Sequence, residues 1–488
     1  MAARKLALGL FLCLLGTTAL ATTRSPRLGG PEFCNLQRLS ATQPSQRLEF
    51  EGGSIETWDV NDDQFQCVGV APMRKTIQPN SLSLPSFHPF PRIVFIEEGE
   101  GIIGVHFPGC AETFDTGVTG EQQIERPRRM GQQGQEELQD ADSHQKVRRF
   151  RRGDIIAIPA GAVHWTYNDG NQEVVAISIN DINNPANQLD MQPRSFFLAG
   201  GTTSSQSVQG RQRQQRPSLE QQQQGGSFDF LNIFAGFDTE LLAEAFNSDP
   251  EIVRSMQQPG NRGLIVKVQE PMQFVTPDEQ QQQIPFERRQ RGGGASNGLE
   301  ETICSAKIVY NLDNQREADV FSRQAGKLNT VNEHKLPILS FLDLSAEKGH
   351  LQPNALLSPH WPTKSHTVVY VLSGDAHIQI VSNNGEAVLD EQVNKGDMFV
   401  VPQFFASVAK AGQNGYEWVA FKTNKSPMKS PLAGYTSVFR AMPLEVITSS
   451  YDVSPSQAQS LKVNRETERA KNMGMRKLVA VKVKGSQS

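Results

Sequence analysis

Runs in which hydrophobic and polar residues alternate, separated by Gly, Pro and Asn, make up much of this chain. Two examples are RIVFIEEGEGIIGV from Arg92 and TVVYVLSGDAHIQI from Thr367. In each, a stretch rich in β-branched residues reaches a glycine and is followed by a second alternating stretch. Alternation with a period of two indicates half-buried strands, and a glycine between two such runs predicts a β-hairpin.

The same series of elements occurs twice along the chain. QPNSLSLPSFHP at Gln78 matches QPNALLSPHWP at Gln352, and RRGDIIAIP matches NKGDMFVVP further on. Each copy ends in a segment where Asp or Ser precedes a proline, at Pro250 and Pro455. Such a residue caps a helix whose first position is the proline. The repeat predicts a mainly β chain with two tandem antiparallel barrels, each followed by a helical extension.

The first helical extension contains DTELLAEAFN, where Leu241, Leu242, Ala245 and Phe246 share one face of a helix. Two interpretations of this apolar face are open. It packs into the core of its own barrel, or it forms part of an interface between subunits.

Long polar inserts separate the matching parts of the first copy. They lie near 111–148 and 202–227, and a third polar tract joins the copies; all are rich in Gln, Arg, Gly and Glu. Such segments bury too little apolar surface to offset their ordering entropy, so we expect them to be disordered. They also account for a composition with only 37 % hydrophobic residues and a mean hydropathy of -0.44.

The N-terminus predicts entry into the secretory pathway. Arg4 and Lys5 precede an apolar stretch that is too short to span a bilayer, and Ala19-Leu20-Ala21 forms a small-x-small cleavage site. We expect cleavage after Ala21. The net charge of -4 gives no reason to expect binding to nucleic acid or to an anionic membrane.

Removal of this signal leaves four cysteines: Cys34, Cys67, Cys110 and Cys304. In an oxidising compartment they predict two disulfides, with three possible connectivities. No CxxC pair occurs among them, so a structural zinc site is not expected.

One stretch carries a candidate metal ligand. GDIIAIPAGAVHWTYN resembles the second signature of the cupin barrel, with the pattern at Gly153, Pro159, Gly161, His164 and Asn168. The resemblance implies that His164 points into the barrel, where a cupin histidine binds a metal. The His-x-His and Glu of the first signature are missing, because His88 is followed by Pro89 and Phe90. A single histidine cannot hold a metal against water, so we interpret His164 as structural and expect no cofactor.

The second copy has lost this signature. Phe404 stands in place of the second glycine and Ser407 in place of the histidine, while His360 and His366 remain nearby. No nucleophile elbow, phosphate-binding glycine loop or His-Glu-x-x-His motif is present. We therefore expect no catalytic residues and no enzymatic activity.

Two barrels without a complete metal site, Gln-rich inserts, a secretory signal and the stretch NGLEETIC from Asn297 to Cys304 occur together. The chain resembles a legumin-type 11S globulin, a seed storage protein, over essentially its whole mature length. The resemblance implies a precursor that trimerises in the endoplasmic reticulum and travels to a protein storage vacuole of the seed. It also makes the protein a candidate food allergen.

The resemblance implies further that an asparaginyl endopeptidase cuts between Asn297 and Gly298, after which the trimers pair into hexamers. The implied disulfides join Cys110 to Cys304 between the pieces, and Cys34 to Cys67 within the first. The implied division begins with a signal peptide at residues 1–21 and a first cupin domain, the acidic chain, at residues 22–257. A linker at residues 258–297 follows, and residues 298–488 form the second cupin domain, the basic chain.

The charge distribution agrees with acidic and basic pieces. Residues 298–488 contain 21 Lys and Arg against 18 Asp and Glu, a net charge of +3. The remainder contains 48 − 21 = 27 against 52 − 18 = 34, a net charge of -7.

Three alternatives stay open. A metal-dependent bicupin of the oxalate-handling type needs three histidines and a glutamate in one barrel, and neither copy supplies them. A vicilin-type 7S globulin shares the storage role, but usually lacks the paired cysteines and the Asn-Gly site. A small-ligand binding module would use the interior of a barrel.

Overall fold

The computed structural model describes residues 36–108, 110, 147–202, 230–258, 262–272, 306–314, 318–463 and 480–482. Ala21, Cys34, Asn297, Gly298 and Cys304 lie outside these residues, as does most of both predicted inserts.

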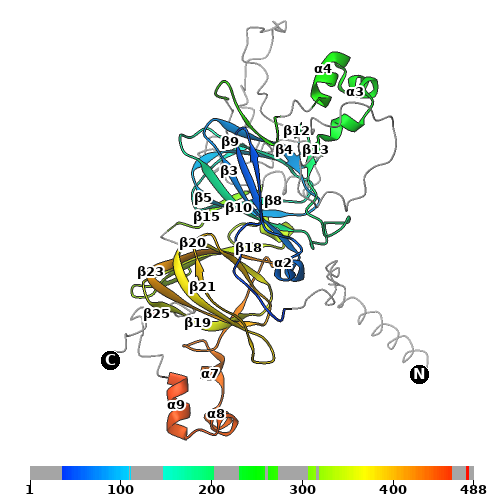
Figure 1. The fold of residues 1–488 in the computed structure, drawn as a ribbon. Coiled ribbons are helices and arrows are strands. Elements are labelled where there is room, and N and C mark those ends of the chain that lie inside the picture. Colours follow the sequence, from blue (N-terminus) through cyan, green and yellow to red (C-terminus); the bar gives the residue numbers. More distant parts are fainter. Residues whose placement is uncertain are drawn as a thin grey trace, which may run out of the picture.

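Two β-barrels lie one above the other (Figure 1), which confirms the predicted fold class. One sheet of the first barrel has the order β1-β2-β3-β10-β5-β8-β15. These strands span Gln46–Phe50, Gly53–Thr57, Val70–Ile77, Val174–Asp181, Arg92–Glu98, Asp154–Ile158 and Val309–Asn311. The other sheet has the order β11-β4-β9-β6-β7, and β14 pairs with β4. Its strands span Phe196–Phe197, Ser81–Phe87, Val163–Asn168, Glu100–His106, Val147–Arg151 and, for β14, Ile265–Lys267.

The second barrel is a single ten-stranded sheet that closes through long bent strands. Its main path is β16-β17-β18-β23-β19-β24, and β20, β21, β22 and β25 pair around it. The path strands span Val320–Ser322, Gly326–Val331, Ser345–Leu351, Ala406–Lys422, Ala355–Pro362 and Lys429–Pro431. The others span Thr367–Val381, Ala387–Asn394, Met398–Val401 and Ala480–Lys482.

The predicted hairpins at Gly99 and Gly374 are wrong: Gly99 connects strands of two different sheets, and Gly374 lies within one long strand. β5 and β6 follow each other through Gly99 but lie in different sheets, and the second copy runs through Gly374 within the single strand β20. Both glycines have positive φ, 83° and 72°. A Cβ there would lie 2.4 Å from the Glu173 carbonyl oxygen or 2.1 Å from that of Gly415. The close approach of a neighbouring strand, rather than a tight turn, thus requires glycine at these positions.

Each barrel is followed by helices at opposite ends of the molecule (Figure 1). After the short pair β12 and β13, the first tail has the 3-10 turn η3 and helices α3 and α4; the second tail has α7, α8 and α9. In the first tail, β12 spans Gly201–Thr202, β13 Phe230–Leu231, η3 Ile233–Gly236, α3 Thr239–Phe246 and α4 Pro250–Gln257. In the second tail, α7 spans Val438–Ala441, α8 Leu444–Tyr451 and α9 Pro455–Val463. Two short helices, α2 and α6, span Asp63–Val68 and Leu339–Leu342. Asp249 caps α4 as predicted, since its carboxylate accepts from the Glu251 amide at 2.8 Å.

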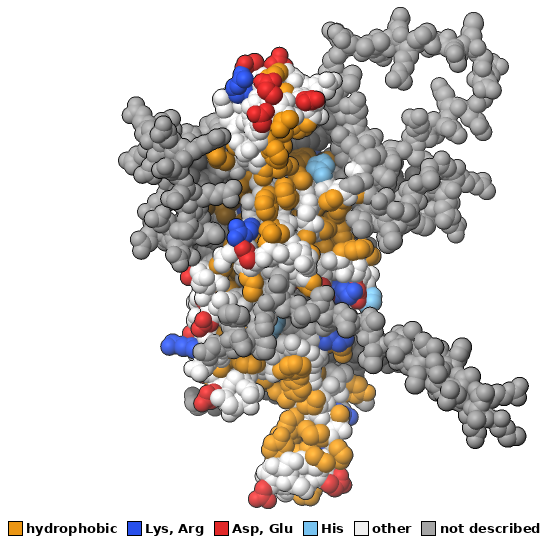
Figure 2. All heavy atoms as spheres, turned by 90° about the vertical axis from the view of Figure 1, so that its right-hand side faces the viewer, with side chains coloured by type: hydrophobic (Ala, Val, Ile, Leu, Met, Phe, Trp, Pro, Cys, Tyr) orange, Lys and Arg blue, Asp and Glu red, His pale blue; other side chains and the backbone are white. Residues whose placement is uncertain are grey.

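The apolar face of α3 does not pack into its own barrel. Leu241 and Phe246 are 65 % and 53 % exposed, while the buried residue of the helix is Ala243. The core interpretation of this face is therefore wrong. The second tail also exposes large hydrophobic residues, namely Tyr435, Val446, Tyr451 and Leu461. Figure 2 shows hydrophobic side chains gathered over this tail.

One hydrophobic core cluster spans the two barrels, and backbone hydrogen bonds link them in both directions. Trp58 of the first packs edge-on against Tyr370 of the second, with ring centroids 6.2 Å apart. β15, which follows the predicted cleavage site, joins the first barrel's sheet through β8. In the other direction, Leu39 and Thr42 donate backbone hydrogen bonds to Val388 and Met398 of the second barrel. The two halves of the chain therefore complete each other's folds.

Candidate functional site

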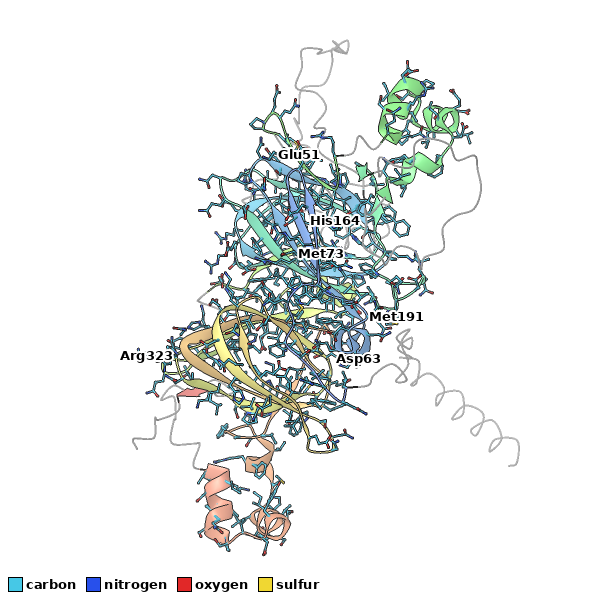
Figure 3. All side chains as sticks on the ribbon, viewed as in Figure 1. Glu51, Asp63, Met73, His164, Met191 and Arg323 are labelled. Atoms are coloured by element: carbon cyan, nitrogen blue, oxygen red, sulfur yellow. The ribbon has the colours of Figure 1, made fainter. Side chains whose placement is uncertain are left out.

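The cupin-like motif forms the turn between β8 and β9, as its glycines and proline predict. Gly153 and Gly161 both have positive φ, and the Gly161 amide donates to the His88 carbonyl oxygen at 2.8 Å. His164 follows in β9, is buried, and lies inside the upper barrel (Figure 3). The predicted position of this histidine is confirmed.

The structure brings His88 and His164 together and places Arg92 between them. The two imidazole centroids are 5.2 Å apart. Arg92 is only 4 % exposed and donates from Nη2 to His88 Nε2 at 2.8 Å and from Nη1 to His164 Nε2 at 3.3 Å. Its Nε donates to Asn180 Oδ1 at 2.6 Å. A guanidinium can only donate, so both imidazoles carry their proton on Nδ1 and accept at Nε2.

This arrangement does not suit a metal ion. Burial, followed by the charge of Arg92, holds the pKa of both histidines well below the usual range. Lys75 adds a second cationic group, whose pKa is lowered to about 7 by burial and by Arg92. The lone pairs that would bind a metal are occupied by guanidinium hydrogens, and the local field repels cations. The residues therefore do not fit a metal cofactor.

Sequence reasoning missed Arg92. It is the fourth residue after His88 and directly precedes the stretch where a cupin glutamate was sought. The sequence does contain a signal for this role: Arg92 is a cation close to the position where the first cupin signature has a carboxylate.

In the second barrel, His360 and His366 have separate hydrogen-bond partners. His360 Nδ1 lies 2.9 Å from the Ser358 carbonyl oxygen, whereas His366 Nδ1 accepts from the Gln403 amide at 3.2 Å. Over the described ranges, no group of three or more His, Cys, Asp or Glu side chains is placed to hold a metal ion. The polar cluster of this barrel is instead Glu347 with Lys422 and Lys429.

Two of the predicted disulfide cysteines are described. Cys67 in α2 and Cys110 after β6 are both disulfide-bonded. Their pairing with Cys34 and Cys304 stays a prediction, because those two partners lie outside the described residues.

Comparison with known proteins agrees with this geometry. The Cupin family model matches residues 39–204 and 310–459, one match in each barrel. The 11S globulin seed storage protein 2 of Sesamum indicum is 52 % identical over 96 % of this chain and 98 % of its own length. The crystal structure of the coconut allergen cocosin is 36 % identical, with a TM-score of 0.72, and covers 89 % of this chain and 97 % of that one.

The two matches and the two barrels define a chain with tandem cupin domains. Within that class, the chain belongs to the 11S globulin seed storage proteins. A vicilin from Solanum melongena shares the fold at 17 % identity and a TM-score of 0.58, over 87 % of this chain and 95 % of that one. None of the helices in the described part of the chain has the length and hydrophobicity to cross a membrane.

Proposed function

We propose that this storage globulin is made as a precursor, cut after Asn297 by an asparaginyl endopeptidase in a protein storage vacuole, and kept as two linked chains that assemble into hexamers. The storage role rests on membership of the 11S globulin family. The cut, the linkage, the assembly and the vacuolar route are the finer parts of the proposal.

The placement of the segments on both sides of the cut carries the proposal. Residues 262–272 contain β14, which pairs with β4, and residues 306–314 contain β15, which pairs with β8. Both flanking segments belong to the first barrel, so a cut between them interrupts no described strand and leaves the β15–β8 pairing as a contact between the two pieces. The new N-terminus of the second piece stays anchored by β15, and the barrel survives the cleavage.

Local packing supports the proposed disulfides. Cys110 packs against the same core cluster as Ile308, four residues after Cys304. The Gln64 side chain in α2 donates to the Ser40 carbonyl oxygen at 3.0 Å, which holds the segment after Cys34 close to the helix of Cys67. The Gln64 bond thus links the helix of Cys67 to the chain that follows Cys34, and Cys110 shares a core cluster with the chain that follows Cys304.

The exposed helical tails support self-assembly. Each tail presents large apolar side chains, and the tails lie at opposite ends of the two-barrel unit (Figure 1). A ring of three copies would bury the first tail of one copy against the second tail of the next. Such contiguous apolar surfaces mark interaction sites.

The test is a non-cleavable precursor. The variant Asn297→Gln, expressed in seeds, should remain one chain and stay a trimer in size-exclusion chromatography, because the tract before the cut stays tied at both ends. The matched control Asn384→Gln changes an exposed loop asparagine and should mature to hexamers. Hexamers formed by uncut Asn297→Gln protein would refute the link between cleavage and assembly.

A metal-dependent enzyme ranks below storage. Arg92 occupies the acceptor atoms of both histidines in the first barrel, and the second barrel separates its histidines. No other described feature favours catalysis over storage.

A further inference from the structure

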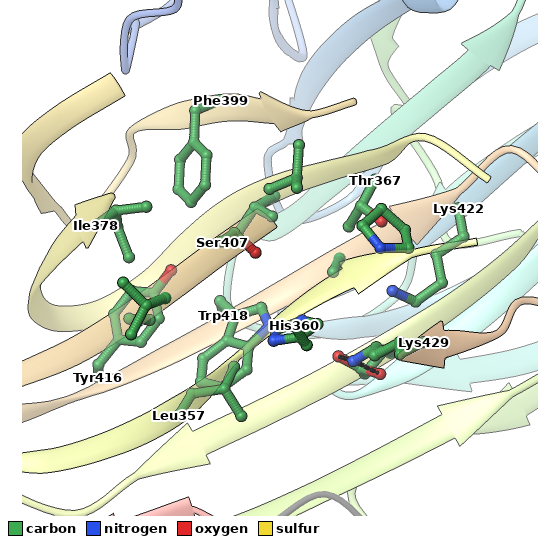
Figure 4. A pocket seen from close by; sticks show the side chains of 17 residues that line it. Leu357, His360, Thr367, Ile378, Phe399, Ser407, Tyr416, Trp418, Lys422 and Lys429 are labelled. Atoms are coloured by element: carbon green, nitrogen blue, oxygen red, sulfur yellow. Dashed lines mark hydrogen bonds and ion pairs between the residues drawn. The ribbon is translucent and has the colours of Figure 1, made fainter. Parts of the chain in front are cut away.

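The second barrel encloses a cavity that the storage role does not use. It has a volume of about 50 Å³. Figure 4 shows Phe399, Ile378 and Tyr416 toward one end, and Lys422, Lys429 and His360 toward the other. The cavity therefore has an apolar end and a charged end.

The charged end of the cavity has two lysines, Lys422 and Lys429, and one carboxylate, Glu347. Lys429 Nζ donates to both carboxylate oxygens of Glu347, at 2.6 and 2.5 Å. Lys422 is 3 % exposed. Among the described residues, the carboxylate of Glu347 is the negative group that acts on its ammonium, and this carboxylate already forms the ion pair with Lys429. Burial lowers the pKa of Lys422 to about 8, so this group is still mostly protonated at pH 7.

The neighbouring groups do not cancel this charge. Burial opposes ionisation of Glu347, but Lys422 and Lys429 lower its pKa to about 2, so it is a carboxylate. Burial lowers the pKa of His360 to about 4, so it is neutral at pH 7. Two ammonium groups thus face one carboxylate, and a buried net charge of this kind is costly unless an anion completes the cluster.

Access to the cluster comes from an outer hollow of about 430 Å³. Glu347, Lys422 and Lys429 line both this hollow and the inner cavity. The three side chains stand at the boundary between solvent and barrel interior, where a small anion can reach Lys422 from outside.

We propose that this cavity binds a short aliphatic monocarboxylate of two or three carbons, with its carboxylate on Lys422 and its alkyl tail among the apolar side chains. The size limit follows from the volume, since an apolar cavity that accepts benzene measures about 150 Å³ and this one is several times smaller. The ligand should carry one negative charge, because the two lysines exceed the single carboxylate of Glu347 by one positive charge. The site is independent of the storage role and of cleavage.

The probe is propionate, observed by saturation-transfer-difference NMR with the intact protein at pH 7. This method detects weak ligands of large assemblies. Wild-type protein should give a propionate signal, and benzoate should bind at least about tenfold more weakly because its ring does not fit. Lys422→Met should weaken propionate binding at least about tenfold, because it removes a charge-assisted hydrogen bond. Lys410→Met is the matched control, since Lys410 is exposed on the same strand, β23, and should bind as wild type does.

A second variant keeps the charge and fills the space. Ala409 lines the cavity, so Ala409→Val should also abolish the propionate signal while Lys422 remains. Absence of propionate binding to wild type, equal binding by Lys422→Met, or benzoate binding as tight as propionate would overturn the proposal.

Discussion

The pair of histidines around Arg92 predicts a specific acid sensitivity of the first barrel. Both imidazoles are neutral in the folded protein, because burial and the guanidinium hold their pKa well below 6.5. In the unfolded chain they regain a pKa of about 6.5 and take up protons below that pH. The folded pKa is the lower one, so stability is lost as the pH falls below about 6.5.

The magnitude follows from linkage. At pH 5.5 each unfolded histidine is about 90 % protonated, so unfolding takes up about 1.8 protons for the pair. Between pH 7 and 5.5 the two together reduce the free energy of unfolding by about 2.5 kcal/mol. The raised pKa of Glu97 and Asp154 acts in the opposite sense, and a comparison with a matched variant removes that contribution.

The assay is proton uptake on complete unfolding in urea at pH 5.5, measured by pH-stat titration, which requires no two-state assumption. The double variant His88→Gln, His164→Gln keeps an acceptor oxygen near each Nε2 position but does not titrate. It should take up about 1.8 fewer protons per chain than wild type. The control His334→Gln changes an exposed histidine and should match wild type. Equal uptake by the double variant and wild type would show that these two histidines are not held neutral in the folded protein.

Three further predictions concern packing and assembly. Glu347→Gln should lower the free energy of unfolding by about 3 kcal/mol in urea denaturation, because it leaves the ammonium of Lys429 buried without its carboxylate. Gly349→Ala should cost about 2 kcal/mol, since its Cβ would lie 2.1 Å from the Trp418 ring. Gly236→Ala, with open space around it, should leave the unfolding midpoint unchanged. Reductant alone should not separate the cut chains in native size-exclusion chromatography, because β15 and the shared core still join them.

The sequence predicts the repeated architecture well, because strand alternation and helix capping are local signals. The cap at Asp249 and the turn leading to His164 appear as expected. The sequence predicts hairpins at Gly99 and Gly374, where the structure has a change of sheet and a continuous strand, since a glycine between two alternating runs gives the same local pattern in all three cases. Only the pairing of distant strands distinguishes them.

The candidate site was predicted in part. The pattern placed His164 in the barrel and showed that a full metal site was missing. It did not show that Arg92 would reach both imidazoles, nor that Lys422 and Lys429 would share the single carboxylate of Glu347, because both depend on contacts between segments far apart in the chain. The exposure of Leu241 likewise depends on what surrounds the helix and not on its own periodicity.

Denaturing gel mobility of the seed-derived protein, with and without reductant, tests the proposed maturation most directly. Cleavage after Asn297 with a disulfide between the pieces predicts one large band that splits on reduction into an acidic and a basic chain, with Gly298 at the N-terminus of the smaller. A single band unchanged by reductant and still containing an intact Asn297-Gly298 bond would contradict it.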